Sequence, residues 1–316
     1  MTTSPDITDI RAAAERIKPF IHRTPVLTSE SINRIGEAAF FFKCENFQRA
    51  GAFKMRGAAN AVLSLSKQEG AKGVATHSSG NHGQALARAA RSAGIPAYIV
   101  MPDTAPKVKQ AAVKEYGAEV IFCKPTLQAR EDTLNEVVER TGATFIHPYN
   151  DLRVIAGQGT TALELIEDTD NQLDVVIAPV GGGGLLAGTA ITTHSLLPHA
   201  SILAGEPEGA SDAFQSLQQG EIVPSVQPDT IADGLLTSLG TNTFPIIRER
   251  VKEIITVNDQ EIIASMRLIW ERMKIIIEPS CAVPLAAMLK EKHRFSNQKI
   301  GLILTGGNVD LEKLPF

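Results

Sequence analysis

Short apolar runs rich in β-branched residues alternate along the chain with stretches in which apolar residues recur every three or four positions. The short runs predict strands, and the 3.6-residue period predicts helices. The expected strands are Ala39–Cys44, Gly73–Thr76, Ala97–Met101, Glu119–Phe122, Thr144–His147, Val175–Ala178, Ile202–Glu206 and Ile300–Leu304. The expected helices are Lys54–Leu65, Asn81–Ala93, Pro106–Tyr116, Leu127–Arg140, Asp259–Met273 and Ser280–Lys292.

This alternation predicts an α/β protein with parallel sheets that carry helices on both faces. Residues from about 73 to 150 contain several strand–helix repeats and could form one compact unit, while the rest could form a second sheet. Ligands of open α/β sheets bind beyond the carboxyl ends of strands. The loops that follow strands are therefore the places to look for chemistry.

Composition and charge exclude several classes of function. The chain has 316 residues, 43% hydrophobic and 21% charged, as in ordinary globular proteins. Its net charge of −4 predicts no nucleic-acid or membrane-surface partner. The spacing of Cys44, Cys123 and Cys281 indicates reduced thiols in the cytoplasm, neither a disulfide framework nor a zinc site. We expect no signal peptide and no transmembrane helix.

The loop Gly51–Gly57 places Lys54 at a predicted helix start, directly after Phe53. The positive end of a helix dipole lowers the pKa of a lysine there. A neutral amine is what Schiff-base formation requires, so Lys54 is a candidate for covalent chemistry. On this heptad alone, a solvated surface lysine remains the alternative.

Two further loops offer neutral hydrogen-bonding groups beside glycines. Ser78–Gly83 reads Ser-Ser-Gly-Asn-His-Gly and contains more polar groups than a helix cap needs. The stretch Thr305–Asn308 ends the last expected strand and could contact a flat ring with its hydroxyl, or form a simple turn.

Four consecutive glycines, Gly181–Gly184, follow a strand and precede a helix. Because such a run is costly in chain entropy, a plain turn does not explain it, and backbone N–H groups there could cradle a phosphate. The spacing Gly182-x-Gly184-x-x-Ala187, with Glu206 about 20 residues on, also matches a dinucleotide fingerprint. A nicotinamide oxidoreductase is therefore a rival hypothesis, but it explains neither Lys54 nor the Ser78–Gly83 loop.

An acidic stretch, Glu206–Asp212, reads Glu-Pro-Glu-Gly-Ala-Ser-Asp. Its carboxylates and carbonyls could bind a hard cation through oxygen ligands. A solvated acidic loop is the alternative.

Taken in order, these motifs resemble those of the fold-type II pyridoxal-phosphate enzymes, whose fold is like that of the tryptophan synthase β subunit. The sequence looks most like the serine racemase, serine/threonine dehydratase and threo-3-hydroxyaspartate dehydratase group. The similarity extends over essentially the whole chain, including residues 24–29, 156–160 and 270–274. It implies two domains, each with a mostly parallel sheet flanked by helices: a large one from residues 1–72 and 151–316, and a small one from residues 73–150, with the active site between them.

The resemblance assigns cofactor contacts residue by residue. Lys54 would hold pyridoxal 5′-phosphate covalently and act as acid and base at the substrate Cα. Phe53 would pack on the cofactor ring, Asn81 would bond its 3′ oxygen, and Thr305 would meet the pyridine nitrogen as a neutral partner. The remaining cofactor contacts would be Gly181, Gly182, Gly183, Gly184, Leu185 and Gly234.

The implied reaction is dehydration and deamination of a β-hydroxy amino acid such as L-serine, giving a 2-keto acid and ammonia. Ser79 matches a second acid/base on the opposite cofactor face, so racemisation through Lys54 and Ser79 is also expected. The substrate carboxylate would be bound by Ser78, Ser79, Asn81 and His82. The alternatives are threonine dehydration and threo-3-hydroxyaspartate dehydration, for which Arg130 could bind the second carboxylate.

The resemblance also implies effectors and a partner subunit. Glu206, the Ala210 carbonyl and Asp212 match a site for Mg²⁺, or for Ca²⁺ or Mn²⁺. A homodimer is expected, with possible ATP binding at its interface. The residues that match the ATP site are Ser29, Ser31, Gln84, Tyr116, Lys274 and Asn308. Arg49 and Ala50 replace a lysine and a threonine of the vertebrate racemases, which leaves activation by ATP open. The stretch Tyr149–Asp151 also departs from those racemases and could reshape the pocket.

Overall fold

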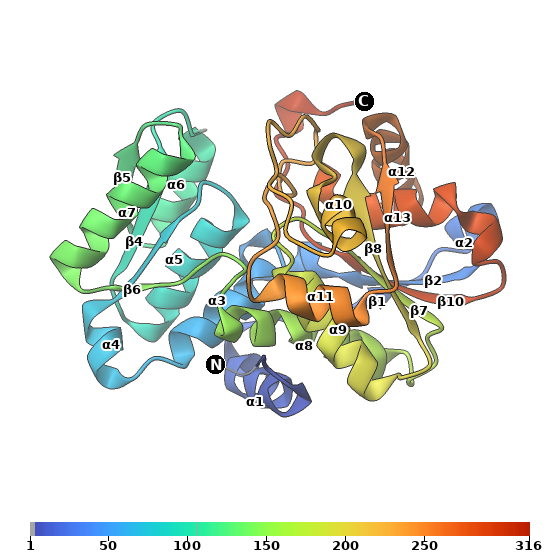
Figure 1. Ribbon diagram of the computed structural model, residues 1–316, viewed down its shortest axis with the longest axis horizontal. Helices are drawn as coiled ribbons and strands as arrows, with labels where there is room; N and C mark the ends of the chain where they lie inside the picture. Colours follow the sequence, from blue (N-terminus) through green and yellow to red (C-terminus); the bar gives the residue numbers. More distant parts are fainter. Residues whose placement is uncertain (1–3, 106) are drawn as a thin grey trace.

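A computed structural model describes residues 4–105 and 107–316, which form two lobes side by side (Figure 1). The strands are β1 (Val26–Leu27), β2 (Ala39–Cys44), β3 (Val74–His77), β4 (Ala97–Pro102), β5 (Glu119–Cys123), β6 (Thr144–Phe145), β7 (Val175–Pro179), β8 (Ser201–Pro207), β9 (Glu253–Val257) and β10 (Lys299–Leu304). The α-helices are α1 (Ile7–Ile17), α2 (Glu30–Gly36), α3 (Lys54–Leu63), α4 (Lys67–Lys72), α5 (Asn81–Ala93), α6 (Lys107–Glu115), α7 (Leu127–Thr141), α8 (Leu152–Asp168), α9 (Gly184–Leu196), α10 (Asp212–Gln219), α11 (Thr243–Arg250), α12 (Asp259–Met273) and α13 (Pro279–Lys290).

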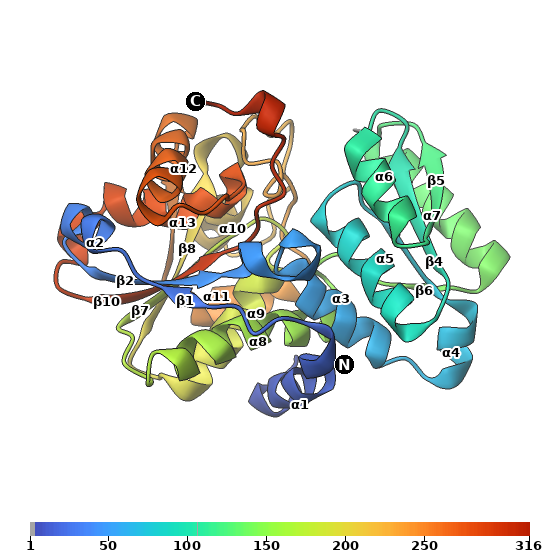
Figure 2. The ribbon, with the colours of Figure 1, turned by 180° about the vertical axis from the view of Figure 1, so that it is seen from behind.

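The larger lobe is built on a six-stranded sheet in the order β1-β2-β10-β7-β8-β9, in which β1 alone runs antiparallel to its neighbour. Side chains of β7 alternate between two cores, with Val175 and Ile177 facing one and Val176 and Ala178 the other. The first core includes α2, α12 and α13, and the second includes α1, α8, α9 and α11, so helices cover both faces (Figure 2). Burial on both faces explains why these strands read as unbroken apolar runs.

The smaller lobe is built on a four-stranded parallel sheet in the order β5-β4-β3-β6. One face packs on α3 and α5 through residues such as Met55, Leu86 and Ile99, and the other packs on α7 through Leu134 and Val137. Helix α3 also packs closely on α8, because a Cβ on Gly157 would lie 2.7 Å from the Gly57 Cα. Helix α3 therefore stands between the two lobes (Figure 1).

The expected fold class is confirmed, and the expected strands and helices are present with ends that differ by a few residues. The strand expected at Thr144–His147 is wrong beyond Phe145, because the His147 ring accepts hydrogen bonds from the next turn. Gly73 has a φ of +83° and lies before β3. Helix α3 ends at Leu63, not Leu65. Pro106 of the expected helix 106–116 lies outside the described residues.

Several elements were not expected, and α8 is the most important for the site. Its residues 154–166 are all buried although several of them are polar, and Gly157 and Gly159 lower its helix propensity. The division into two domains at residues 72/73 and 150/151 stays a prediction. In the part of the chain that the structure describes, no helix is long and apolar enough to cross a membrane.

An ion-pair cluster that is almost entirely buried holds the first turn of α3 in place. The Arg56 guanidinium donates to both carboxylate oxygens of Glu45 at 2.7 and 2.8 Å and to both oxygens of Glu164 at the same distances. Its Nη1 also reaches the Thr160 hydroxyl at 3.3 Å. Lys43, also buried, lies 2.7 Å from Glu164. Since Arg56 is two residues from Lys54, this fork fixes the helix turn that carries Lys54.

We expect Arg56→Met to destabilise the protein by about 3 kcal/mol, because it leaves Glu45 and Glu164 buried without their main cation. Urea unfolding monitored by circular dichroism measures this loss. The control is Arg267→Met, which breaks an exposed pair with Glu271 and should change stability by no more than about 0.5 kcal/mol. Equal stabilities for the two variants would contradict the role given to the cluster.

Candidate active site

The start of α3 is tied by backbone hydrogen bonds to the loop that follows β10. The Phe53 N–H donates to the Thr305 carbonyl at 2.9 Å, and the Gly307 N–H donates to the Gly51 carbonyl at 3.0 Å. Two of the sequence-predicted loops thus lie side by side. Lys54 and Thr305 consequently lie on adjoining backbone segments.

Lys54 is partly buried, and its Nζ donates to the Pro148 carbonyl at 3.0 Å and lies 5.1 Å from the centre of the Phe53 ring. Burial lowers the pKa of Lys54 to about 8, while the charge of Glu278 opposes this shift. The direction of the pKa shift was expected from the sequence, with the helix dipole as its cause; the main cause is desolvation. An amine with this pKa is about one-fifth neutral near pH 7.4, a far larger share than in an ordinary lysine, and the neutral form is the one that covalent chemistry requires.

Asn81, at the first turn of α5, is held in one orientation by two side chains. Its Nδ2 donates to the Glu278 carboxylate oxygens at 2.9 and 3.1 Å, and its Oδ1 accepts from the Asn308 Nδ2 at 2.9 Å. Burial raises the pKa of Glu278 to about 7. Glu278 was not predicted from the sequence, because nothing in the residues before α13 marks a buried carboxylate.

The glycine run Gly181–Gly184 forms a tight cradle at the start of α9. Gly183 has a φ of +86°, and a Cβ on Gly182 would lie 2.3 Å from the Tyr149 ring. The Thr243 hydroxyl donates to the Gly182 carbonyl at 2.9 Å, which fixes the position of the loop. The helix N-terminus and close-packed glycine backbone are suited to an anion such as a phosphate.

Further cofactor candidates lie beside this cradle and next to the start of α3. A Cβ on Gly181 would lie 3.4 Å from the Gly234 carbonyl, and the Gly234 N–H donates to the Ser280 hydroxyl at 2.9 Å. The Thr305 side chain is buried directly after β10, near enough to the Cys281 thiol to lower its pKa in part, although burial raises that pKa overall. Leu185, in the first turn of α9, is buried.

The loop Ser78–His82 presents half-buried hydroxyls at the start of α5. The Ser78 hydroxyl accepts from the Gly80 N–H at 3.3 Å, and Ser79 is also half-buried. A Cβ on Gly80 would meet no atom within 4 Å, so the loop borders open space. The His82 ring is buried, with its Nε2 3.3 Å from the Ile146 carbonyl and its Nδ1 without a hydrogen-bond partner among the described residues.

Arg130 lies on α7, where its Nε donates to the Thr126 carbonyl at 3.4 Å. Its charge also helps to lower the pKa of His77, although burial is the larger cause. It is therefore near the carboxyl end of β3.

The acidic stretch ends β8 and begins α10. Both oxygens of the buried Glu206 accept backbone N–H bonds, from Ala213 and Phe214, at 2.8 Å. Neither oxygen of buried Asp212 has a partner with hydrogen-bond geometry among the described residues, although the Ser225 hydroxyl is near enough to lower its pKa in part. Burial nevertheless raises the pKa of Glu206 to about 8 and that of Asp212 to about 6. Two buried carboxylates with free acceptor capacity are suited to a hard cation.

The residues that matched an ATP site are spread over several elements. Ser29 and Ser31 lie 3.1 Å apart, oxygen to oxygen, at the start of α2, and Asn308 Nδ2 also donates to the Ala50 carbonyl at 2.8 Å. Gln84 is buried in α5, and Lys274 follows α12 with a φ of 59°. ATP binding stays a prediction.

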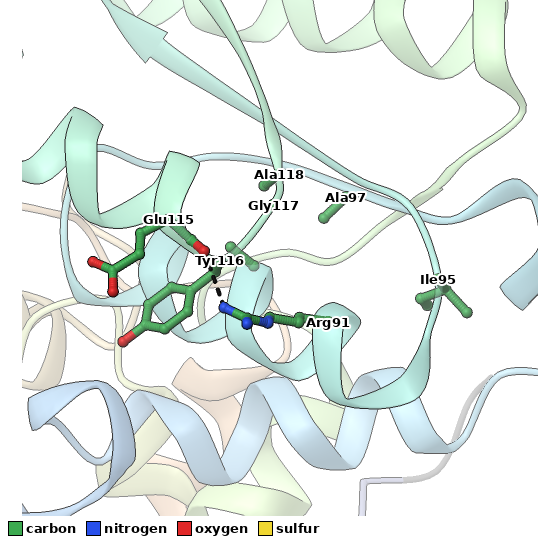
Figure 3. A pocket seen from close by; sticks show the side chains of 8 residues that line it. Arg91, Ile95, Ala97, Glu115, Tyr116, Gly117 and Ala118 are labelled. Carbon is green, nitrogen blue, oxygen red and sulfur yellow. Dashed lines mark hydrogen bonds between the residues drawn. The ribbon is translucent and has the colours of Figure 1, made fainter.

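A cavity of ≈ 390 Å³ lies at the opposite edge of the small sheet, where β4 begins (Figure 3). Tyr116, Ile95 and Ala97 are among its lining residues, and the Arg91 guanidinium donates across it to the Glu115 carbonyl at 3.0 Å. It is not part of the Lys54 site.

Residues 17–306 match the model of a family described as pyridoxal-phosphate dependent enzymes. The chain is 51% identical over 312 residues to a β-hydroxyaspartate dehydratase of Paracoccus denitrificans (strain Pd 1222), covering 99% of each. It is 52% identical over 310 residues to a serine racemase of Dictyostelium discoideum, covering 97% of this chain and 95% of the relative. The crystal structure of Dictyostelium serine racemase superposes with a TM-score of 0.94 at 51% identity, covering 98% of this chain and 100% of that one.

We expect Lys54 in the cofactor-free protein to lose its proton with a midpoint near pH 8. Acylation of Lys54 at a series of pH values, followed by peptide mass spectrometry, measures this midpoint. Glu278→Gln should move it to lower pH, because the Glu278 charge stabilises the protonated amine.

The control for this titration is Glu271→Gln, which removes an exposed carboxylate on α12 and should leave the Lys54 midpoint unchanged. A midpoint that rises in Glu278→Gln would contradict the account of Lys54.

Proposed function

Because the chain belongs to the family of pyridoxal-phosphate dependent enzymes, we propose that it dehydrates and deaminates a β-hydroxy amino acid such as L-serine to a 2-keto acid and ammonia. We further propose that it racemises serine through Lys54 and Ser79. The observation that carries the proposal is the position of Lys54, an amine with a lowered pKa. Its Nζ donates to the carbonyl of Pro148, and the next residue, Tyr149, packs on the glycine cradle.

The residues of the site suit the cofactor of this family. Pyridoxal phosphate supplies an electron sink for negative charge that develops at the substrate Cα. Lys54 would hold it covalently and Gly181–Leu185 would bind its phosphate. Asn81, oriented by Glu278, would donate its remaining amide N–H to the 3′ oxygen.

The other contacts are expected to tune and orient the ring. Phe53 would pack against it, Gly234 would contact it from the loop beside the cradle, and the Thr305 hydroxyl would face the pyridine nitrogen. A neutral partner at this nitrogen leaves it little protonated, which stabilises negative charge less than an acidic partner would. Such a site suits a substrate that loses its β-hydroxyl promptly, because the negative charge at Cα then need not be stabilised for long.

Proton transfer at the substrate is assigned to Lys54 and Ser79. Lys54, once released from the cofactor, would take the proton from Cα as a general base. The start of α5 would bind the substrate carboxylate through Ser78, Ser79, Asn81 and the backbone N–H of His82. A hydroxyl at Ser79, on the opposite face from Lys54, would return a proton with inversion.

Two other substrates of the same chemistry remain candidates. The similarity to a β-hydroxyaspartate dehydratase favours threo-3-hydroxyaspartate, whose second carboxylate Arg130 could bind. L-Threonine would give 2-oxobutanoate. The nicotinamide hypothesis loses its support, because residues 17–306 match the family of pyridoxal-phosphate dependent enzymes.

Effectors and assembly complete the proposal. A divalent cation, Mg²⁺ or Ca²⁺ or Mn²⁺, would bind Glu206, the Ala210 carbonyl and Asp212. Exposed apolar side chains at Phe47, Ile276 and Phe316 support a homodimer. The three buried, free cysteines are compatible with a cytoplasmic location.

The test of the function is a panel of L-serine, D-serine, L-threonine and threo-3-hydroxyaspartate, with keto acid and D-serine measured separately. We expect Ser79→Ala to lower D-serine formation by about 10²-fold while keto-acid release persists, because only inversion needs the second acid. Loss of neither product in Ser79→Ala would refute the role of Ser79, and a wild-type protein that makes neither product would refute the function.

Removal of the cation should destabilise the wild-type protein. Saturating Mg²⁺ at about 100 times its dissociation constant should add about 2.7 kcal/mol to the free energy of unfolding. Without metal, the Asp212 pKa of about 6 lies above its ordinary value of 3.8, so the stability contributed by this group is present below pH 3.8 and is lost as pH rises from there through about 6.

The variant Asp212→Asn should abolish the Mg²⁺ effect and leave the metal-free protein at least as stable at pH 7.5, because it removes a buried charge. Thermal unfolding with EDTA or Mg²⁺ measures both. A Mg²⁺ stabilisation that survives in Asp212→Asn would place the cation elsewhere.

A further inference from the structure

The imidazole of His147, just after β6, is fixed in one tautomer. Its Nδ1 accepts backbone N–H bonds from Tyr149 at 3.3 Å and Asn150 at 3.0 Å. A ring nitrogen that accepts carries no hydrogen, so in the neutral ring the hydrogen is on Nε2. Burial, followed by the charges of His77 and Lys54, lowers the pKa of His147 to about 4 against a smaller opposing effect of Asp151. The ring is therefore a neutral N–H donor at physiological pH.

This donor lies between the features that define the candidate active site. Lys54 Nζ bonds to the carbonyl of Pro148, the residue that follows His147, and the Lys54 charge reaches the ring. On the other side, the His147 ring centre is 4.5 Å from that of Tyr149, whose ring packs on Gly182 of the cradle. His147 thus adjoins both the proposed base and the proposed phosphate site.

The Nε2–H of His147 has no hydrogen-bond partner within residues 4–105 and 107–316, and the side chain is only half-buried. Phe145 and His77 flank the ring at 5.6 and 6.5 Å between centres. A donor in partly apolar surroundings beside Lys54 gains most when a bound molecule supplies an acceptor.

We propose that the Nε2–H of His147 donates a hydrogen bond to the β-oxygen of the substrate and so selects amino acids that carry oxygen on Cβ. The inference rests on the proposed elimination, since Cβ is bonded to the Cα from which Lys54 takes the proton. His147 forms no covalent bond and exchanges no proton with the substrate, so its Nε2 keeps its hydrogen throughout. A neutral donor suits a hydroxyl, whereas a second carboxylate would require a cation such as Arg130.

Two substitutions distinguish the role of Nδ1 as an acceptor from the role of Nε2–H as a donor. In His147→Asn, the Oδ1 can replace Nδ1 as the acceptor for the Tyr149 and Asn150 N–H groups, but the distal donor is lost. In His147→Gln, the amide can place a donor near the former Nε2, but the proximal acceptor is lost. The comparison substrate is β-chloro-L-alanine, which loses chloride and carries no β-oxygen.

We expect His147→Asn to keep the melting temperature and the visible absorbance of the bound cofactor, and to lower kcat/KM for L-serine by about tenfold, the value of one hydrogen bond. Its kcat/KM for β-chloro-L-alanine should stay within about twofold of wild type, since that substrate has no oxygen to lose contact with. His147→Gln should have a lower melting temperature than the wild type, because it loses the acceptor for the two backbone N–H groups. Its ratio of kcat/KM for L-serine to kcat/KM for β-chloro-L-alanine should be closer to the wild-type ratio than that of His147→Asn, because it keeps a donor.

Equal losses for both substrates in His147→Asn, or no loss for L-serine, would overturn the inference. If His147→Asn fails to bind cofactor, His147→Ser replaces it, because a serine hydroxyl also accepts from backbone N–H groups two and three residues on. A wild-type protein that eliminates chloride but not water retains the elimination chemistry and overturns the β-oxygen contact. A wild-type protein that eliminates neither overturns the proposed function itself.

Discussion

The chemistry of this chain depends on how firmly the first turn of α3 is held. Backbone hydrogen bonds join Phe53 and Gly51 to the loop after β10, and the Arg56 guanidinium, in the first turn of the helix, binds Glu45 and Glu164. Lys54 lies between these constraints and bonds to the segment after β6. Because α3 packs on both lobes, the same turn connects the glycine cradle of one sheet with the Ser78–His82 loop of the other.

Burial sets the charges of the groups that matter. It lowers the pKa of Lys54 and His147 and raises the pKa of Glu278 and Asp212, so each is driven toward its neutral form. The consequences differ with the partners at hand. Lys54 becomes a base, His147 becomes a neutral donor, and Asp212 is left with oxygens that a cation would satisfy.

The parts of the site predicted from sequence are those whose local composition is costly to the fold unless a ligand binds there. The role of Gly181–Gly184 could be predicted because four consecutive glycines are explained only where the backbone approaches a ligand or a ring closely. The role of Lys54 could be predicted because its motif is followed along the chain by three others in the order typical of the family. The stretch from Tyr149 was expected to reshape the pocket, but the packing of the Tyr149 ring on the glycine cradle was not predicted, and neither His147 nor Glu278 was assigned a role. These roles depend on contacts across the fold that no short pattern encodes. The buried helix α8 was not predicted for a different reason: Gly157 and Gly159 within it lower its helix propensity.

The most direct test of the account is to identify the residue that holds the cofactor. The protein loaded with pyridoxal phosphate is reduced with borohydride, digested and sequenced by mass spectrometry. The account predicts one pyridoxyl group per chain, on Lys54. A label on a different lysine, or keto-acid release by a protein that carries no label at Lys54, would contradict it.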